Sequence, residues 1–425
     1  MQEKYNLLYT KEEIQALDRK FGTPFLIFDE KALREKVRAV NKAFSWCPDF
    51  KNYYAVKAHP NPYILEILKQ EWCGMDCSSL GELYLSEAIW NTWTDIMFTS
   101  NNTPIEEYKK AKQLDAIINF DDISHIDYYK DNVWEFPSVV CCRYNPWDEK
   151  TWWNDIIWIP SEAKYWMTKI QIFEAYKKFK DYGLTRFGLH TMVMSNDLNP
   201  DSLVETARLL LELVVEIEQK LNIEFEFINL WGGVWIPYHP DDKAVDLEYV
   251  ASEIKKVYDE LIDNSSRKNP LNIVMEQWRN ITWPYAQLVS KVRHKKETYK
   301  NYVWLDSSMS DFMRPWVYGS YHHITVLGKE NSPQTHTYDI TGSLCENNDK
   351  FAIDRKLPEI EIWDYIVLHD AWAHWNAMWF NYNAKLKCKE LLLKENGEVK
   401  LIKRAETLKD YFSTTDYKNL NDLIK

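Results

Sequence analysis

The spacing of apolar and polar residues changes near residue 285 and divides the chain into two parts. Before that point, short apolar runs take turns with longer segments whose apolar residues recur at helical spacing. The predicted strands here are Asn52–Val56, Gly74–Ser78, Asp95–Phe98, Asp115–Asn119, Ser138–Arg143, Leu184–His190, Phe225–Leu230 and Leu271–Glu276. The predicted helices include Pro62–Lys69, Gly81–Ile89, Ile105–Gln113, Lys169–Tyr182, Asp201–Leu221 and Leu247–Asp263. Eight strands, most of them followed by a helix, predict an α/β fold, the (β/α)8 barrel.

Beyond residue 285 the helical spacing largely stops, and the pattern is typical of an all-β domain. The predicted strands are Gln287–Arg293, Asn301–Leu305, His323–Leu327, Thr337–Ile340, Tyr365–His369, Lys385–Leu393 and Val399–Arg404. A closing helix is expected at Leu408–Phe412, and FLIFD at Phe25–Asp29 reads as a strand that precedes the barrel. We therefore predict a barrel over residues 30–285 and a C-terminal all-β domain formed by residues 286–425 together with residues 1–29.

Charge and composition exclude several classes of protein. The chain has 425 residues, with 52 Lys+Arg against 64 Asp+Glu, so its net charge of −12 argues against nucleic acid as a partner. No apolar run approaches the length of a membrane span, and the start MQEKYNLLYTKEE lacks a signal core, so we expect a cytoplasmic protein. The seven cysteines are scattered without paired spacing, which favours reduced thiols; no metal site is predicted.

Chemically active side chains gather at the predicted carboxyl ends of the barrel strands, where such barrels carry their active sites. Lys57 follows the first strand, and Glu276 ends the eighth. Taken alone, Lys57 is more simply a solvated surface lysine, and Glu276 a rim carboxylate paired with Arg279. At a barrel mouth they also suit an aldehyde cofactor, pyridoxal 5′-phosphate (PLP), with Lys57 as the amine and Glu276 facing the ring nitrogen. Gly232-Gly233 after the seventh strand allows the close backbone approach that a phosphate needs.

A series of motifs, in order along nearly the whole chain, resembles the diaminopimelate decarboxylase family. The motifs are YAVKAHPNP, MDCSSLGEL, INLWGGVWIPY, EQWR, RPWVYGSYHH, GSLCENNDKFAIDR and NYNAKLKCKELLL. YAVKA is shared with ornithine and arginine decarboxylases, whereas GSL with CENND, and Arg-Pro-x-x-Tyr, are more specific. The resemblance implies a fold-type III PLP enzyme, in which a barrel is joined to a β domain.

The resemblance also implies roles for the matching residues. Lys57 matches the catalytic lysine that carries PLP, and Cys345 matches a candidate proton donor. The residues that match cofactor-binding positions are Lys57, Asp76, His190, Ser195, Gly232, Gly233, Glu276, Arg279 and Tyr382. Those that match substrate-binding positions are Arg279, Arg314, Tyr318 and Glu346. Cys345 and Glu346 match a pair that enters the neighbouring subunit's site, so the resemblance implies a homodimer with shared active sites, whose β domain contributes substrate-binding and dimer contacts.

The implied activity is decarboxylation of meso-2,6-diaminopimelate to L-lysine, the last step of lysine biosynthesis. Two alternatives stay open: another basic amino-acid or carboxy-polyamine decarboxylase of the same fold, and a PLP-binding protein without activity. Two departures leave room for the second alternative. Met192 replaces a histidine that packs on the PLP ring in many relatives, and His374 replaces a family tyrosine.

The balance of glycine and tryptophan is abnormal. Glycine is only 11 of 425 residues, where about 7% is usual, while tryptophan reaches 20. Trp231 and Trp278 stand where the family motifs have glycine, and only Trp46 lies where tryptophan looks natural. The glycine codon GGA differs by one base from UGA, which some genetic codes read as glycine and others as tryptophan. We therefore hypothesise UGA-glycine recoding; the alternative is a genuinely tryptophan-rich protein.

Overall fold

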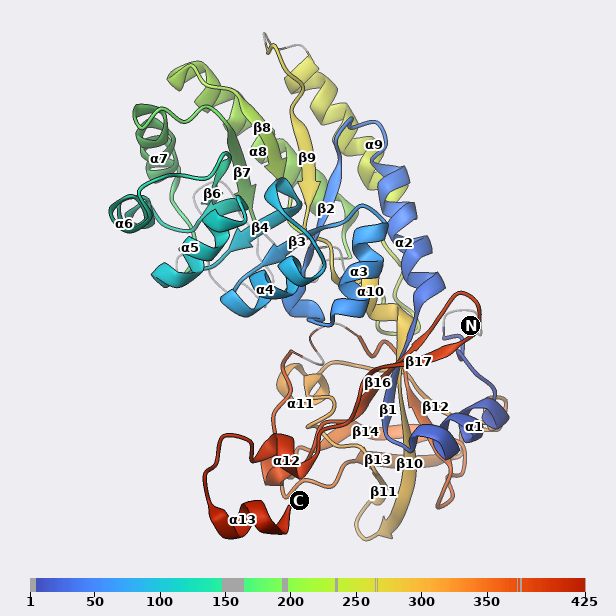
Figure 1. Ribbon diagram of the computed structural model, residues 1–425. Helices are drawn as coiled ribbons and strands as arrows, with labels where there is room; N and C mark the ends of the chain where they lie inside the picture. The colour runs from blue at the N-terminus through green and yellow to red at the C-terminus, as the bar shows by residue number, and fades with distance from the viewer. Residues whose placement is uncertain are drawn as a thin grey trace. The chain divides into compact units, whose positions relative to one another are not determined.

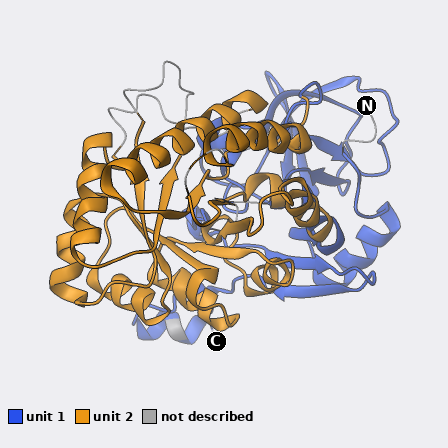
Figure 2. Cartoon of the chain, turned by 90° about the horizontal axis from the view of Figure 1, so that it is seen from above, with its two compact units in different colours: residues 1–33, 237–242, 282–425 blue, residues 34–236, 243–281 orange. Residues whose placement is uncertain are grey.

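The structure is a computed structural model that describes residues 5–146, 164–192, 198–233, 236–263, 265, 267–372, 374 and 377–424. The chain divides into two compact units (Figure 2). One unit comprises residues 34–236 and 243–281, and the other residues 1–33, 237–242 and 282–425. The second unit joins segments that are distant in sequence, and residues 237–242 group with it although they follow the seventh barrel strand.

The first unit is a closed parallel barrel in which helices follow most of the strands (Figure 1), so the predicted fold class is confirmed. Its strands are β2 (Lys51–Ala55), β3 (Gly74–Cys77), β4 (Ile96–Thr99), β5 (Ile117–Phe120), β6 (Val140–Tyr144), β7 (Phe187–Thr191), β8 (Phe225–Asn229) and β9 (Asn272–Met275). Its helices are α2 (Glu30–Ala43), α3 (Pro62–Gln70), α4 (Leu80–Ala88), α5 (Ile105–Gln113), α6 (Ser124–Val133), α7 (Lys169–Asp181), α8 (Pro200–Leu221) and α9 (Leu247–Tyr258). The ring closes where β2 pairs with β9, with Lys51 opposite Val274.

Local sequence explains why these helices begin where they do. Asn199 caps α8 by accepting a hydrogen bond from the backbone N–H of Asp201, and Pro200 takes the first helical position, where its missing N–H costs nothing. Thr168 caps α7 in the same way and forms a reciprocal capping box with Gln171. These caps fix the first residues of α7 and α8, Lys169 and Pro200, which lie well beyond the ends of β6 and β7.

The second unit is built on a nine-stranded sheet. Its strands are β1 (Phe25–Asp29), β10 (Ala286–Glu297), β11 (Asn301–Leu305), β12 (Ile324–Val326), β13 (His336–Thr341), β14 (Lys350–Leu357), β15 (Tyr365–Leu368), β16 (Lys389–Leu393) and β17 (Val399–Lys403). The main path runs β14-β13-β11-β10-β1-β16-β17, and β15 pairs with both β10 and β12. Short helices α1 (Lys11–Phe21), α11 (Arg314–Tyr318), α12 (Leu408–Tyr411) and α13 (Lys418–Leu423) complete this unit.

The N-terminal strand belongs to the second unit because it is sandwiched within the sheet. β1 runs antiparallel to β10 and parallel to β16. Four of its five residues are buried, and Phe25 and Ile27 share a core cluster with Ile14 and Leu17 of α1. Among the helices that the structure describes, none is long and apolar enough to cross a membrane.

Candidate active site

The ends of the barrel strands bring an exposed amine together with buried acids. Lys57 lies in the short 3-10 turn Val56–Ala58 that directly follows β2, and its residue is exposed. Asp76 lies in β3, and Glu276 follows β9; both are buried. The Lys57 ammonium is close enough to lower the pKa of both carboxyl groups. The structure therefore gathers these three residues, as the sequence predicts.

Asp76 is held by a relay of polar side chains along neighbouring strands. The hydroxyl of Thr99 donates to Asp76 Oδ1 at 2.5 Å, and Asn119 Nδ2 donates to Thr99 Oγ1 at 2.6 Å. Burial raises the pKa of Asp76 above its ordinary value, against the lowering effect of the nearby Lys57 charge. These hydrogen bonds fix the orientation of the Asp76 carboxyl group. Its other oxygen, Oδ2, has no hydrogen-bond partner among the described residues.

Glu276 is a buried acid at the mouth of the barrel whose pKa is raised above its ordinary value. Asn229, at the end of β8, donates to Glu276 Oε1 at 2.7 Å, and His190 Nε2 lies 3.7 Å from the same oxygen. Burial is the main cause that raises the pKa of Glu276, and the charge of Asp76 adds to it. Burial also lowers the pKa of His190 far below its ordinary value, so its imidazole stays neutral. The neutral imidazole of His190, next to a Glu276 carboxyl group that retains its proton, is suited to contact with a flat aromatic cofactor.

Arg143 is a functional candidate to which the sequence motifs assigned no role. It lies in β6, where its Nη1 pairs with Asp121 Oδ1 at 2.7 Å and donates to Asn101 Oδ1 at 2.7 Å. Its charge lowers the pKa of both Asp76 and Glu276. In the sequence, Arg143 is only a positively charged residue at the end of an apolar strand. It becomes a functional candidate once the structure shows which carboxylates lie near it.

Glu82 extends this acidic group at the start of α4. Its carboxylate accepts a 2.6 Å hydrogen bond from the backbone N–H of Ser78, one residue before the cap Ser79. Burial raises the pKa of Glu82 to about 7, in spite of that hydrogen bond. Because its carboxyl group titrates near neutrality and lies near Lys57, Glu82 is a second group at the mouth of the barrel, besides Glu276, that can hold a proton.

The backbone after β8 approaches the backbone after β9 closely at Gly232. A side chain on Gly232 would overlap the backbone carbonyl of Glu276 and come within 2.6 Å of Gln277 Cα, so only glycine fits. Its neighbour Trp231 has a left-handed backbone, φ 57°, and is buried. Gly233 follows in the same loop, and Ser195 lies outside the described residues.

Arg279 opens the short helix α10 (Arg279–Thr282), which follows β9, and is buried. Its guanidinium lies 4.2 Å from the centre of the Trp278 ring, a cation–π contact. Trp278 itself is 4% exposed. The family motif has glycine at the position of Trp278.

The remaining predicted residues belong to the second unit. Arg314 opens α11 and is buried, with its guanidinium 4.3 Å from the Trp283 ring and 4.8 Å from the ring of Tyr318. Glu346 and Tyr382 line one cavity of about 230 Å³ together with Met309, Trp316, Leu344 and Phe380. Cys345, next to Glu346, is the only exposed cysteine of the seven. The structure thus gathers Glu346 with Tyr382, and Arg314 with Tyr318.

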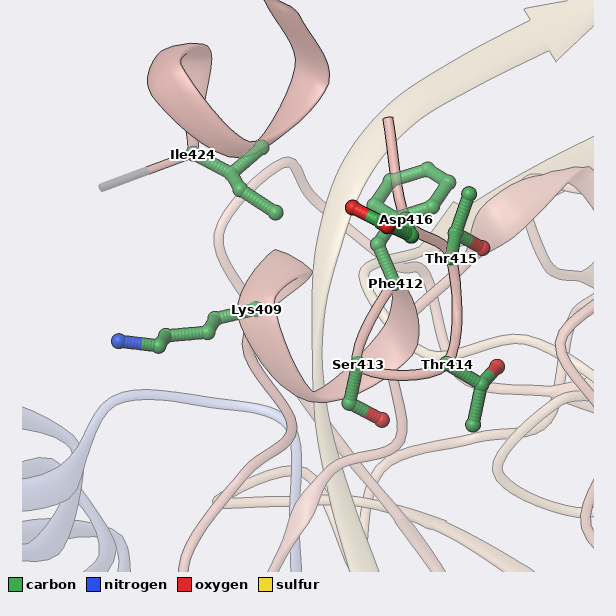
Figure 3. Close-up of a pocket in the computed structure, with 7 residues that line it drawn as sticks. All are labelled: Lys409, Phe412, Ser413, Thr414, Thr415, Asp416 and Ile424. Carbon is green, nitrogen blue, oxygen red and sulfur yellow. The ribbon is translucent and has the colours of Figure 1, made fainter. Parts of the chain in front are cut away.

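A separate hollow of about 470 Å³ lies near the C-terminus (Figure 3). Its walls come from α12, from residues 412–416 and from Ile424. The figure shows the Lys409 side chain extending away from Asp416, so these two charges do not converge on one point. None of the residues with predicted roles lines this hollow, and it carries no argument about catalysis.

The barrel residues fit PLP. An aldehyde needs a primary amine, which Lys57 offers, and a pyridine nitrogen needs an acid such as the buried Glu276. Asp76 Oδ2 and both ring nitrogens of His190 have no hydrogen-bond partner among the described residues, so polar groups remain to be satisfied by a ligand. Gly232, with no Cβ, lets the loop after β8 lie directly against the backbone of Glu276.

Comparison with known proteins agrees with this geometry. The family described as "Pyridoxal-dependent decarboxylase, pyridoxal binding domain" matches residues 30–282. The chain belongs to this family of PLP-dependent decarboxylases. The predicted cofactor and the predicted reaction class, a carboxy-lyase, are thereby confirmed at the level of the family.

Individual relatives cover nearly the whole chain. Protein TabA of Pseudomonas amygdali pv. tabaci is 37% identical over 94% of this chain and 92% of its own length. Diaminopimelate decarboxylase of Methanothermobacter thermautotrophicus is 29% identical over 96% of this chain and 95% of its own. The crystal structure of diaminopimelate decarboxylase from M. jannaschii in complex with L-lysine superposes with a TM-score of 0.86 at 28% identity, covering 95% of this chain and 94% of that one. The predicted resemblance is confirmed.

Proposed function

We propose that this chain catalyses the PLP-dependent decarboxylation of meso-2,6-diaminopimelate to L-lysine and CO2, the last step of lysine biosynthesis. The observation that carries the proposal is the placement of Lys57 beside the buried, high-pKa Glu276, in a chain whose relatives include several diaminopimelate decarboxylases. PLP bound through Lys57 supplies the electron sink that decarboxylation of an α-amino acid requires.

Within the barrel, each residue has a task that its environment supports. Lys57 binds the cofactor aldehyde, and Glu276 holds a proton at the pyridine nitrogen, a task that suits a carboxyl whose pKa is already raised. The backbone at Gly232 and Gly233 receives the phosphate. The full proposed cofactor set is Lys57, Asp76, His190, Ser195, Gly232, Gly233, Glu276, Arg279 and Tyr382.

The substrate's far end explains the second group of residues. meso-Diaminopimelate carries an ammonium and a carboxylate at the end that does not react. We assign the carboxylate to Arg314 and Tyr318, with Arg279 reaching both cofactor and substrate, and the ammonium to Glu346. When the bond between the α carbon and the departing CO2 breaks, its electron pair ends in a new C–H bond, and the Cys345 thiol donates that proton.

We also propose a homodimer that shares its active sites, with Cys345 and Glu346 entering the site of the partner subunit, and a cytoplasmic location. The location is supported by the state of the cysteines: all seven are free thiols, and six of them are buried.

The decisive experiment is CO2 release from meso-diaminopimelate by PLP-loaded protein, with Lys57→Ala as the control. We would assay the printed sequence and a version with glycine in place of every tryptophan except Trp46. CO2 release that depends on Lys57 supports the proposal, and release that survives Lys57→Ala overturns the mechanism.

A substrate panel separates the alternatives. Faster release from ornithine, arginine or a carboxy-polyamine than from meso-diaminopimelate would overturn the assigned specificity. A protein that binds PLP at Lys57 yet releases CO2 from no diamino acid would be a binding protein without activity.

A further inference from the structure

The loop that carries Cys345 and Glu346 connects two antiparallel strands of the second unit. It runs from Gly342, after β13, to Asp349, before β14. Cys345 is exposed, and an exposed loop of eight residues has many conformations open to it. Catalytic groups on such a loop need something that fixes their backbone.

Asp349 fixes the base of the loop. It is buried, and its carboxylate accepts hydrogen bonds from the backbone N–H of Met309 at 2.7 Å and of Leu344 at 2.8 Å. Gly342 N–H donates to the Asp349 carbonyl at 3.0 Å. A side chain on Gly342 would overlap the Asp349 carboxylate and come within 2.6 Å of Ser308 Cα. The base is therefore closed, and the backbone N–H of Asp349 also donates to the Glu346 carbonyl at 3.0 Å, but none of these contacts is made to Cys345 itself.

Asn383 fixes the tip. The backbone N–H of Cys345 donates to Asn383 Oδ1 at 2.7 Å, across 38 positions of sequence. Asn383 lies in the turn Tyr382–Ala384, in a left-handed conformation with φ 55° and ψ 23°. Asparagine and aspartate are the residues with a side-chain acceptor that tolerate this conformation well. The position thus requires both a left-handed backbone and an oxygen that can accept.

The contact joins the two segments that line the cavity described above. Tyr382, adjacent to Asn383, and Glu346, adjacent to Cys345, both line that cavity. The Glu346 carboxylate also accepts a hydrogen bond from the backbone N–H of Asn348 at 3.2 Å, which orients it within its own loop. The bond between Asn383 and Cys345 therefore sets how the Cys345–Glu346 pair lies relative to Tyr382.

We propose that Asn383 is a positioning residue for the reaction, which holds Cys345 to deliver its proton and Glu346 to bind the substrate ammonium. This inference rests on the proposed decarboxylase function. Because a misplacement of about 1 Å at a reacting group costs on the order of 100-fold in rate, loss of one hydrogen bond at the tip is expected to be visible in kcat.

Two substitutions separate positioning from folding. Asn383→Gly keeps the left-handed backbone without strain but removes the acceptor, whereas Asn383→Asp keeps both. In the holoenzyme we expect Asn383→Gly to lower kcat by about 10- to 100-fold. Asn383→Asp should stay within about threefold of the unchanged chain, since the acceptor remains. The PLP absorbance band, which reports on Lys57, should be the same in all three proteins.

Thiol reactivity gives a readout that does not depend on turnover. Under excess iodoacetamide, the alkylation rate of Cys345 should change in Asn383→Gly and be nearly unchanged in Asn383→Asp. Equal kcat and equal alkylation rates for Asn383→Gly and the unchanged chain would overturn the inference, as would an Asn383→Asp protein that is as slow as Asn383→Gly. If the unchanged holoenzyme released no CO2, the proposed function would fail, and the alkylation rates would still decide whether Asn383 positions Cys345.

Discussion

Seven tryptophans have a backbone conformation that side chains rarely adopt. Among the residues that the structure describes, fourteen other than glycine have positive φ, and half of them are tryptophan: Trp72, Trp90, Trp93, Trp134, Trp166, Trp231 and Trp363. Trp72, Trp90 and Trp134 are also 84, 85 and 77% exposed, so no packing compensates for the strain. A left-handed conformation costs most residues about 1 kcal/mol or more and costs glycine almost nothing. This geometry supports the hypothesis of UGA-glycine recoding.

Replacing these tryptophans with glycine should stabilise the protein. We expect Trp72→Gly, Trp90→Gly and Trp134→Gly each to raise the free energy of unfolding by about 1 kcal/mol, because strain is relieved and no buried area is lost. Urea unfolding measures the change. Trp46→Gly is the matched control: Trp46 packs edge-on against Tyr258 with ring centres 5.4 Å apart, so its loss should destabilise by about 2 kcal/mol or more. If all four substitutions destabilised the protein, the interpretation that glycine belongs at positions 72, 90 and 134 would be contradicted.

The recoding hypothesis itself is tested on protein from its native cell. Peptides that span Trp72, Trp90 and Trp231 should carry glycine at those positions, and the peptide with Trp46 should carry tryptophan. Mass spectrometry distinguishes the two residues directly. Tryptophan at position 231 in the native protein would refute the hypothesis.

Glu82 makes stability depend on pH. Its pKa is raised from 4.5 to about 7 by burial, so the folded state holds a proton that the unfolded state releases. This proton contributes about 3 kcal/mol to the free energy of unfolding. The contribution is fully present below pH 4.5 and is lost as pH rises through 7. The PLP-free Glu82→Gln variant should therefore lose less stability between pH 4 and pH 8 than the unchanged chain does. Urea unfolding at both values checks this; equal losses in the two proteins would contradict the assignment.

At the scale of the elements, Gly232 determines how closely the loops after β8 and β9 approach. Gly232→Ala would push a methyl group into the Glu276 carbonyl, so we expect PLP affinity to fall at least about tenfold. PLP titration followed by absorbance gives the affinity. Gly81→Ala in α4 is the matched control, because its new methyl group would meet nothing closer than 3.9 Å. Equal affinities for the two variants would show that the close approach is not required.

Most elements were predictable because their patterns are local. All eight barrel strands and β1 were predicted, with ends that differ by up to three residues, since tertiary hydrogen bonds decide where a strand ends. β14 was missed because KFAIDRKL has four charged residues in eight, and at the edge of the sheet its exposed positions tolerate them. The strand predicted at Lys385–Leu393 begins only at Lys389, after the turn Tyr382–Ala384.

At the scale of the whole molecule, the residues of the candidate site also divide into those that could be predicted from the sequence and those that could not. Lys57 and Glu276 were predictable because barrel topology brings the carboxyl ends of distant strands to one rim. Arg143 was given no role and Asn383 was missed because their roles depend on partners elsewhere in the chain: Asp121 and Asn101 for Arg143, and Cys345 for Asn383. No periodicity or spacing encodes such a pair.

A shared active site predicts complementation between two inactive chains. Lys57→Ala removes the amine from the subunit's own barrel, and Cys345→Ala removes the proton donor that we assign to the partner subunit's site. If the two variants exchange subunits, half of the dimers are mixed, and each mixed dimer holds one intact site. Activity should therefore return to about a quarter of that of the unchanged enzyme. Assay of CO2 release after mixing, with light scattering to establish the dimer, measures this. A mixture as inactive as its components, in samples proven to contain mixed dimers, would place Cys345 and Lys57 of one chain in the same site.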